Sequence, residues 1–201
     1  MTLPLSPSSR NDRRQRIVIA ASQMFAERSY VEVQMDDLAR AAEVAKPTIY
    51  RYFSSKEDLF LEALDGTMSE MVAEVSRVAD EGAPAATVLR RMVLAALKSF
   101  AQCTAAICAL DGTDSALGER GRSMMRRRAR QIREEFVRVL ERGVADGDLR
   151  GLDPDVTSRA ILGAVRMTAT ADDAPHDERT ALSLTDLLLH GLASRPREAE
   201  G

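Results

Sequence analysis

Apolar residues recur at intervals of three and four along almost the whole of this 201-residue chain. That interval places side chains on one face of an α-helix, which repeats every 3.6 residues, whereas a strand alternates by two. Two-residue alternation bounded by turn signals is almost absent. Because an amphipathic helix must bury its apolar stripe against another element, the pattern predicts an all-α protein.

Prolines, glycines and capping residues divide this pattern into segments. We expect helices over about residues 12–28, 35–42, 46–53, 54–82, 84–109, 124–145 and 154–169, and a last one ending near residue 193. Ser54, with Glu57 three residues later, predicts a capping box. Asp153 followed by Pro154 predicts an N-cap and a first helical residue. Residues 111–123 are rich in loop formers, so at most one short helical turn is expected there.

Composition favours a globular protein, with 45% hydrophobic and 29% charged residues. The first ten residues lack the apolar stretch of a signal peptide, and no apolar run approaches the roughly 18 residues of a membrane helix. We therefore expect a cytoplasmic protein without a membrane partner. Cys103 and Cys108 lie in an alanine-rich stretch that favours buried thiols. Neither His176 nor His190 has neighbours at metal-ligand spacing, so no metal site and no cofactor is expected.

The net charge of −3 conceals an asymmetry along the chain. Residues 1–56 hold nine Lys or Arg against six Asp or Glu, a balance of +3, so the remainder carries −6. Only the first quarter therefore has a charge suited to phosphates.

The stretch AKPTIYRYFSSKEDLF, residues 45–60, places a proline in what otherwise reads as a short helix. Proline costs about 3 kcal/mol inside a helix and almost nothing in its first turn, so Pro47 predicts a helix start. At about 100° per residue, Ile49 and Phe53 share one side and are expected to face a core with Leu38 and Phe25. The opposite side carries Pro47, Thr48 and Arg51, flanked by Tyr50 and Tyr52.

Polar donors on the outward side of the second of two short helices are typical of a helix-turn-helix. The candidate DNA contacts are Lys46, Pro47, Thr48, Tyr50, Arg51, Tyr52 and Lys56. Arg51 is the expected base reader, since a guanidinium can hold guanine O6 and N7 together. Lys56 and the two tyrosines are expected to hold phosphates. The alternative for the tyrosines is simple core packing.

The segment QMDDLARAAEVAKPTIYRYFSSKEDLFLEAL, residues 34–64, resembles the DNA-binding signature of TetR-type transcriptional regulators, and the likeness extends from about Arg13 to Leu64. The resemblance implies a homodimer whose paired recognition helices enter adjacent major grooves of operator DNA. It also implies a C-terminal helical half that binds a small-molecule inducer, and most members repress. The expected domains are residues 10–66, with the helix-turn-helix at about 35–53, and residues 67–201 for ligand binding and dimerisation.

The chain departs from the family pattern at four helix ends and turns. Glu43 and Ser29 stand where glycine is usual, and a side chain in a left-handed turn carries a steric cost. Ala45 and Gln34 replace the usual Ser or Thr caps, each worth about 1 kcal/mol. These changes weaken local stability without removing a DNA-facing group. They leave one alternative open, a helical ligand-binding protein that has lost DNA binding.

Two further sites are expected in the C-terminal part. Small or flexible apolar residues predict a pocket for a mainly apolar effector, with plain core packing as the alternative. These residues are Met68, Met71, Met92, Ala96, Phe100, Cys103 and Met124. Small residues and excess leucine in the last two helices predict a dimer interface. Its candidate residues are Ile161, Ala164, Val165, Leu184, Leu187 and Leu188.

The run MMRRRARQIR, residues 124–133, admits three interpretations. A second nucleic-acid patch and an anionic-ligand clamp, through Arg126 or Arg130, are two of them. Nearby acidic residues favour the third, an exposed face with local i,i+4 ion pairs.

Catalysis is the rival function from another class. The chain lacks GxGxxG, GxxxxGK[ST], GxSxG and HExxH. Its paired carboxylates are neighbours in sequence, as at Asp36 and Asp37 or Asp172 and Asp173, and adjacent helix positions do not face one another. We therefore expect no enzyme activity.

Overall fold

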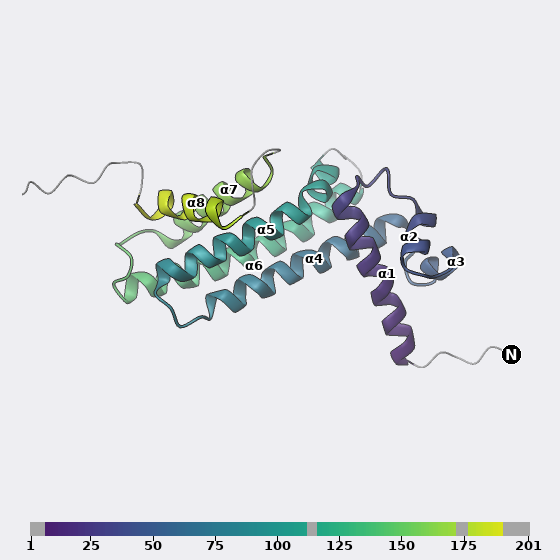
Figure 1. Ribbon diagram of the computed structural model, residues 1–201, viewed down its shortest axis with the longest axis horizontal. Helices are drawn as coiled ribbons and strands as arrows, with labels where there is room; N and C mark the ends of the chain where they lie inside the picture. The colour runs from purple at the N-terminus through teal and green to yellow at the C-terminus, as the bar shows by residue number, and fades with distance from the viewer. Residues whose placement is uncertain (1–6, 112–115, 172–176, 191–201) are drawn as a thin grey trace, which may run out of the picture. The chain divides into compact units, whose positions relative to one another are not determined.

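The computed structural model describes residues 7–111, 116–171 and 177–190. Within these ranges the chain forms eight α-helices and no strand, which confirms the all-α prediction (Figure 1). The helices are α1 Pro7–Glu27, α2 Met35–Ala41, α3 Lys46–Tyr50, α4 Lys56–Ala79, α5 Ala85–Asp111, α6 Ala116–Ala145, α7 Pro154–Ala169 and α8 Glu178–His190. In the described ranges, no helix is both long and apolar enough to cross a membrane.

Capping explains where two of the helices begin. Helix α7 starts as predicted, because the Asp153 side chain accepts hydrogen bonds from the backbone N–H groups of Asp155 and Val156. The predicted capping box at the start of α4 is wrong by one residue. Ser55, rather than Ser54, accepts the N–H of Asp58 at 3.1 Å, so the helix begins at Lys56.

Helix α6 begins eight residues earlier than its predicted start at Met124, and the expected loop is wrong over residues 116–123. Gly118, Gly121 and Met124 lie at intervals of three and are all buried. Packing of this face outweighs the cost of about 1 kcal/mol that each glycine adds inside a helix. Residues 112–115, also part of the expected loop, lie outside the described residues.

The chain divides into two compact units. Unit 1 is residues 1–73 with 102–130, and unit 2 is residues 74–101 with 131–201. Each of the long helices α4, α5 and α6 therefore contributes to both. The division at residue 66 between DNA-binding and ligand-binding domains stays a prediction.

The core of unit 1 joins α1, α2, α3 and the first half of α4. Its fully buried side chains include Ile17, Leu38, Ile49, Leu59 and Phe60. Unit 2 buries Leu89, Met92, Phe136, Val139 and Ile161. At one end of unit 2, the Asp148 carboxylate accepts the backbone N–H of Ala85 at 2.9 Å, which caps the start of α5.

Candidate DNA interface

A tight turn sets α3 against α2. The N–H of Val44 donates to the carbonyl of Ala39 at 2.9 Å, and the N–H of Glu43 donates to that of Arg40 at 3.2 Å. These two bonds form a Schellman motif, which satisfies the last carbonyls of α2 and needs a left-handed residue at Glu43. With the bond from the N–H of Ala42 to Leu38, the carbonyls of Leu38, Ala39 and Arg40 all accept a backbone N–H at the end of α2.

Glu43 takes this conformation with φ 54°, as expected from the family's usual glycine. Its carboxylate lies 3.7 Å from the Arg16 guanidinium, but both side chains are largely exposed, so the pair adds little. Ser29, the other residue in place of a glycine, is not left-handed. Its N–H and hydroxyl both donate to Glu32, which closes that loop.

The caps of the two short helices are weak, as predicted. Gln34 precedes α2 and Ala45 precedes α3, and neither side chain makes a capping hydrogen bond. Asp36 and Asp37 in the first turn of α2 stabilise the helix, because their negative charges lie at the positive end of its dipole. Helix α3 has no such charge, so tertiary packing must hold its five residues in place.

Helix α3 buries one side and exposes the other. Ile49 is 0% and Phe53 5% exposed, and Phe25 and Leu38 are buried as well, which confirms the predicted core face. The predicted DNA-facing residues differ in exposure. Lys46, Pro47, Tyr50 and Arg51 are exposed, whereas Thr48, Tyr52 and Lys56 are half-buried. Their contacts with DNA stay a prediction.

The two lysines of this candidate DNA interface have different partners. The Lys46 Nζ lies 3.0 Å from an Asp36 oxygen, and the hydrogen bond to this carboxylate raises the lysine pKa. The Lys56 Nζ lies 4.4 Å from the centre of the Tyr30 ring, and partial burial lowers the pKa of its ammonium. Of these two lysines, Lys46 is paired with a carboxylate and Lys56 with an aromatic ring.

Tyr30 belongs to a cluster of three rings that sequence reasoning missed. Its ring centre lies 6.2 Å from that of Phe25 and 5.0 Å from that of Phe60. Phe25 and Phe60 meet edge to face at 4.9 Å. Burial, followed by the charge of Glu57, raises the Tyr30 pKa. Because Tyr30 lies in the loop between α1 and α2, no helical periodicity could place it.

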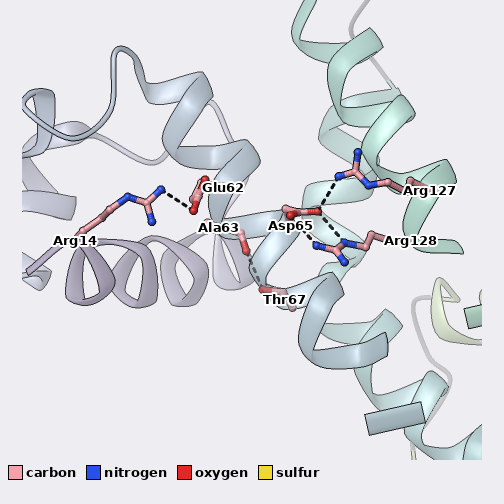
Figure 2. A network of polar contacts seen from close by, with 7 residues as sticks. All are labelled: Arg14, Glu62, Ala63, Asp65, Thr67, Arg127 and Arg128. Atoms are coloured by element: carbon pink, nitrogen blue, oxygen red, sulfur yellow. Dashed lines mark hydrogen bonds and ion pairs between the residues drawn. The ribbon is translucent and has the colours of Figure 1, made fainter. Parts of the chain in front are cut away.

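Helix α4 carries ion pairs in two directions (Figure 2). Glu62 accepts from Arg14 of α1 at 2.7 Å, while Asp65 accepts from Arg128 of α6 through two bonds of 2.9 and 2.8 Å. Arg127 lies 3.5 Å from the same carboxylate. The predicted local ion pairs are therefore wrong for Arg127 and Arg128, because their acidic partner lies on another helix. The predicted exposure is confirmed for Arg127 but is wrong for Arg128.

Further contacts extend these pairs. Near the start of α4, Asp58 accepts from Arg120 of α6 at 3.1 Å. The Arg14 guanidinium also lies 5.2 Å from the centre of the ring of Phe53, three residues after the end of α3. The hydrogen bond from Arg128 keeps the Asp65 pKa low, and the nearby charges act in the same direction.

Two clefts lie within unit 1. A cleft of about 610 Å³ is lined by the acidic and basic residues of these ion pairs, together with Tyr52, Phe53, Leu61 and Met124. A second, of about 490 Å³, lies between α1 and α4, where its walls include Gln15, Ser22, Thr67 and Glu70. Of the predicted effector residues, only Met124 lines either of these two clefts.

The predicted effector residues are mostly buried. Met68, Met71 and Met124 are buried in unit 1, and Met92, Ala96 and Phe100 in unit 2. The side chain of Cys103 lies outside the described residues. The effector site stays a prediction.

The predicted dimer residues divide by exposure, and the structure corrects two of them. Ile161 is 4% and Val165 0% exposed within one copy, so neither side chain has surface left to bury against a partner. Ala164, Leu184 and Leu188 are half-buried and Leu187 is exposed. The spacing of apolar residues could not tell the inner face of α7 from its outer face, and the location of the dimer interface stays a prediction.

Two family models match this chain in sequence. One, described as bacterial regulatory proteins of the tetR family, matches residues 17–63, which hold the helix-turn-helix. The other, a tetracyclin repressor-like C-terminal domain, matches residues 82–170. The chain belongs to the TetR family. It is thus a DNA-binding transcriptional regulator with a ligand-binding domain.

Similar proteins extend this TetR assignment over most of the chain. The transcriptional repressor KstR2 of Mycobacterium tuberculosis is 28% identical over 75% of this chain and 76% of its own. A fatty acid metabolism regulator protein of Bacillus subtilis is 25% identical over 90% of this chain and 95% of its own. The crystal structure of a TetR/AcrR-family regulator from Thermobifida fusca is 28% identical in sequence and superposes with a TM-score of 0.74. The match covers 92% of this chain and 100% of the other.

Replacing Glu43 by glycine should raise the free energy of unfolding by about 0.5–1 kcal/mol, because glycine adopts the left-handed region without the steric cost of a Cβ. Urea denaturation measures the change. Glu43→Ala removes the carboxylate but keeps the Cβ, so it should give little of this gain. Equal gains from both variants would assign the strain to the charge rather than to the backbone.

Replacing Asp65 by asparagine should lower stability at pH 7 by about 1 kcal/mol, a figure reduced for the partial exposure of the carboxylate. Because the folded pKa is depressed, the stabilisation is present above the unfolded pKa of about 3.9 and is lost as pH falls through the folded value. Urea unfolding at pH 7, 5, 4 and 3 should therefore show the two proteins converging only at acid pH.

The exposed carboxylate of Glu70, on the same helix, supplies the control for this pH series. Glu70→Gln should change stability by less than about 0.5 kcal/mol at each pH. A stability gap between wild type and Asp65→Asn that persists unchanged to pH 3 would contradict an ion pair at this position.

Proposed function

We propose that this TetR-family protein is a homodimeric repressor that binds operator DNA through α3 and is released by a small, mainly apolar effector. DNA binding is proposed because α3 has one side buried against the core and the other side exposed. Ile49 and Phe53 fix the helix on the core, while Tyr50, 48% exposed, and Arg51 remain free to meet a groove. Because operator DNA is the proposed partner, we propose that the protein is cytoplasmic.

Arg51 is the proposed base reader, and Lys46 and Thr48 are proposed to reach a second base or a thymine methyl. Lys56, Tyr50 and Tyr52 are proposed to position the helix on the phosphates. Pro47 starts α3 without requiring an N–H partner. The rival proposal, a ligand-binding protein that has lost DNA binding, is disfavoured because the turn at Glu43 keeps both hydrogen bonds of its Schellman motif.

For the dimer interface, we propose the outer face of α7 together with α8. Val156, Ala160, Gly163 and Met167 follow one another at helical spacing and are all exposed, with Val156 at 60% and Met167 at 71%. The two small residues let another helix approach closely, and Leu182 and Leu187 of α8 add exposed apolar surface. Two-fold pairing with a second copy would bury this stripe.

For the effector, we propose a molecule with a long apolar chain. Flexible methionines among the predicted site residues suit an extended alkyl group, which requires few directed polar contacts. Similarity to the Bacillus subtilis fatty acid metabolism regulator supports fatty acids as the class to test first. Arg126 or Arg130, both exposed on α6, would meet a carboxylate or phosphate at the end of such a chain.

We propose that effector binding reaches the DNA interface through α4. A shift of α6 would move α4, because the two-bond pair joins Arg128 to Asp65. One turn earlier, Glu62 passes the displacement to α1 through Arg14. Release then follows when the recognition helices of the two subunits no longer match successive major grooves.

Replacing Lys56 by alanine should weaken binding to all duplexes about equally and reduce the salt dependence by about one phosphate per subunit. Replacing Arg51 by alanine should instead cost about 1–3 kcal/mol of discrimination at one position in each half-site. The measurement is fluorescence anisotropy across a salt series, with a duplex selected from a random pool and its scrambled counterpart.

Identical losses on both duplexes for both variants would refute the division between positioning and reading residues. If neither variant loses affinity, or if the wild-type protein selects no duplex, the DNA-binding proposal fails. Adding fatty acids to the same assay tests the effector class, since the correct class should release the selected duplex.

Replacing Met167 by lysine should convert the dimer to a monomer, because burial against a second copy would strand an unpaired charge. The side chain is exposed within one subunit, so the subunit itself should stay folded. Sedimentation velocity reports the oligomeric state. Ser69→Lys, an equally charged change at an exposed position of α4, should leave the dimer intact. A dimer that survives Met167→Lys would place the interface elsewhere.

A further inference from the structure

Two lysines of the candidate DNA interface are held in chemically different ways. Lys46 forms an ion pair with Asp36 at 3.0 Å, so a phosphate that approaches this ammonium must compete with a carboxylate. The Lys56 ammonium instead rests on the face of the Tyr30 ring, 4.4 Å from its centre. A ring face attracts the cation without accepting a conventional hydrogen bond, so the N–H donors remain available to a phosphate.

The ring of Tyr30 is itself fixed. It is half-buried and packs against Phe25 and Phe60, which are 3% and 1% exposed, so the ring beneath Lys56 is held against the core. A free lysine loses rotamer entropy when it is immobilised. A lysine already resting on a rigid ring has lost part of that entropy before DNA arrives.

We propose that Tyr30 is a positioning residue for DNA binding, whose ring holds the Lys56 ammonium at the start of α4 in readiness for a phosphate. The inference rests on the proposed phosphate contact of Lys56. It assigns to the loop between α1 and α2 a part in DNA affinity that requires no direct contact between Tyr30 and DNA. The ring face is the active element, so the hydroxyl group is dispensable.

The first measurement is made on the free protein and does not involve DNA. The ring current of Tyr30 should move the NMR signals of the Lys56 Cε protons upfield in the wild type and in Tyr30→Phe. The shift should disappear in Tyr30→Leu, which keeps an apolar side chain but removes the ring. Unshifted Lys56 signals in the wild type would overturn the proposal.

The second measurement is a double-mutant cycle on binding to the selected duplex. Tyr30→Leu should weaken binding about two- to ten-fold per subunit, the cost of immobilising one long side chain, whereas Tyr30→Phe should be close to wild type. In the Lys56→Ala background, Tyr30→Leu should cost nothing further. Equal losses in both backgrounds would show a general effect on folding and would overturn the positioning role.

The outcomes separate this inference from the proposed function. If the wild type binds and Lys56→Ala weakens binding, but Tyr30→Leu does not, the inference fails and the phosphate contact stands. If the wild type binds and Lys56→Ala has no effect, there is no phosphate contact to position and the inference fails, while DNA binding stands. A wild type that binds no duplex overturns both. A loss in Tyr30→Phe as large as that in Tyr30→Leu would assign the effect to the hydroxyl.

Discussion

Burial of Ile49 and Phe53 beneath α3 is the interaction on which the DNA-binding surface depends. A five-residue helix without a side-chain cap at Ala45 cannot be stable by itself, because nucleation costs more than its few hydrogen bonds return. Burial of these two apolar side chains holds the helix in place. It also orients the helix, because fixing one side toward the core leaves the opposite side facing outward. Tyr50 and Arg51 are thus presented by packing rather than by intrinsic helix propensity.

Helix α4 extends that dependence toward α6. Glu62 and Asp65 lie one turn apart, yet the first is held by Arg14 of α1 and the second by Arg128 of α6. The same short segment therefore touches the helix behind the recognition helix and the helix whose later residues belong to unit 2. If effector binding acts through α4 as proposed, this segment couples the ligand and DNA sites, since displacement of one partner would alter the geometry offered to the other.

The two lysines of the candidate DNA interface differ in the group that contacts the ammonium. Lys46 has a carboxylate partner, whereas the candidate phosphate contact Lys56 has an aromatic one. An ammonium in an ion pair must give up part of that pairing when it binds a phosphate. An ammonium on a ring face keeps its N–H donors available. If Lys46 and Lys56 contact DNA as proposed, the first arrangement would limit nonspecific attraction and the second would leave the ammonium ready for a phosphate.

The sequence by itself determined the helical class, the position of the helix-turn-helix and its inward face, because these follow from local spacing, Pro47 and the period of 3.6 residues. It also placed the N-cap at Asp153 and the strained turn at Glu43, both set by residues close in the chain. Only the tertiary structure decided that α6 starts at Ala116, that Arg127 and Arg128 pair with Asp65, that Ile161 and Val165 face inward, and that Tyr30 supports Lys56. Each of these depends on contact between residues far apart in sequence, where burial outweighs local preference and the partner of a charge is whichever opposite charge packing brings within reach.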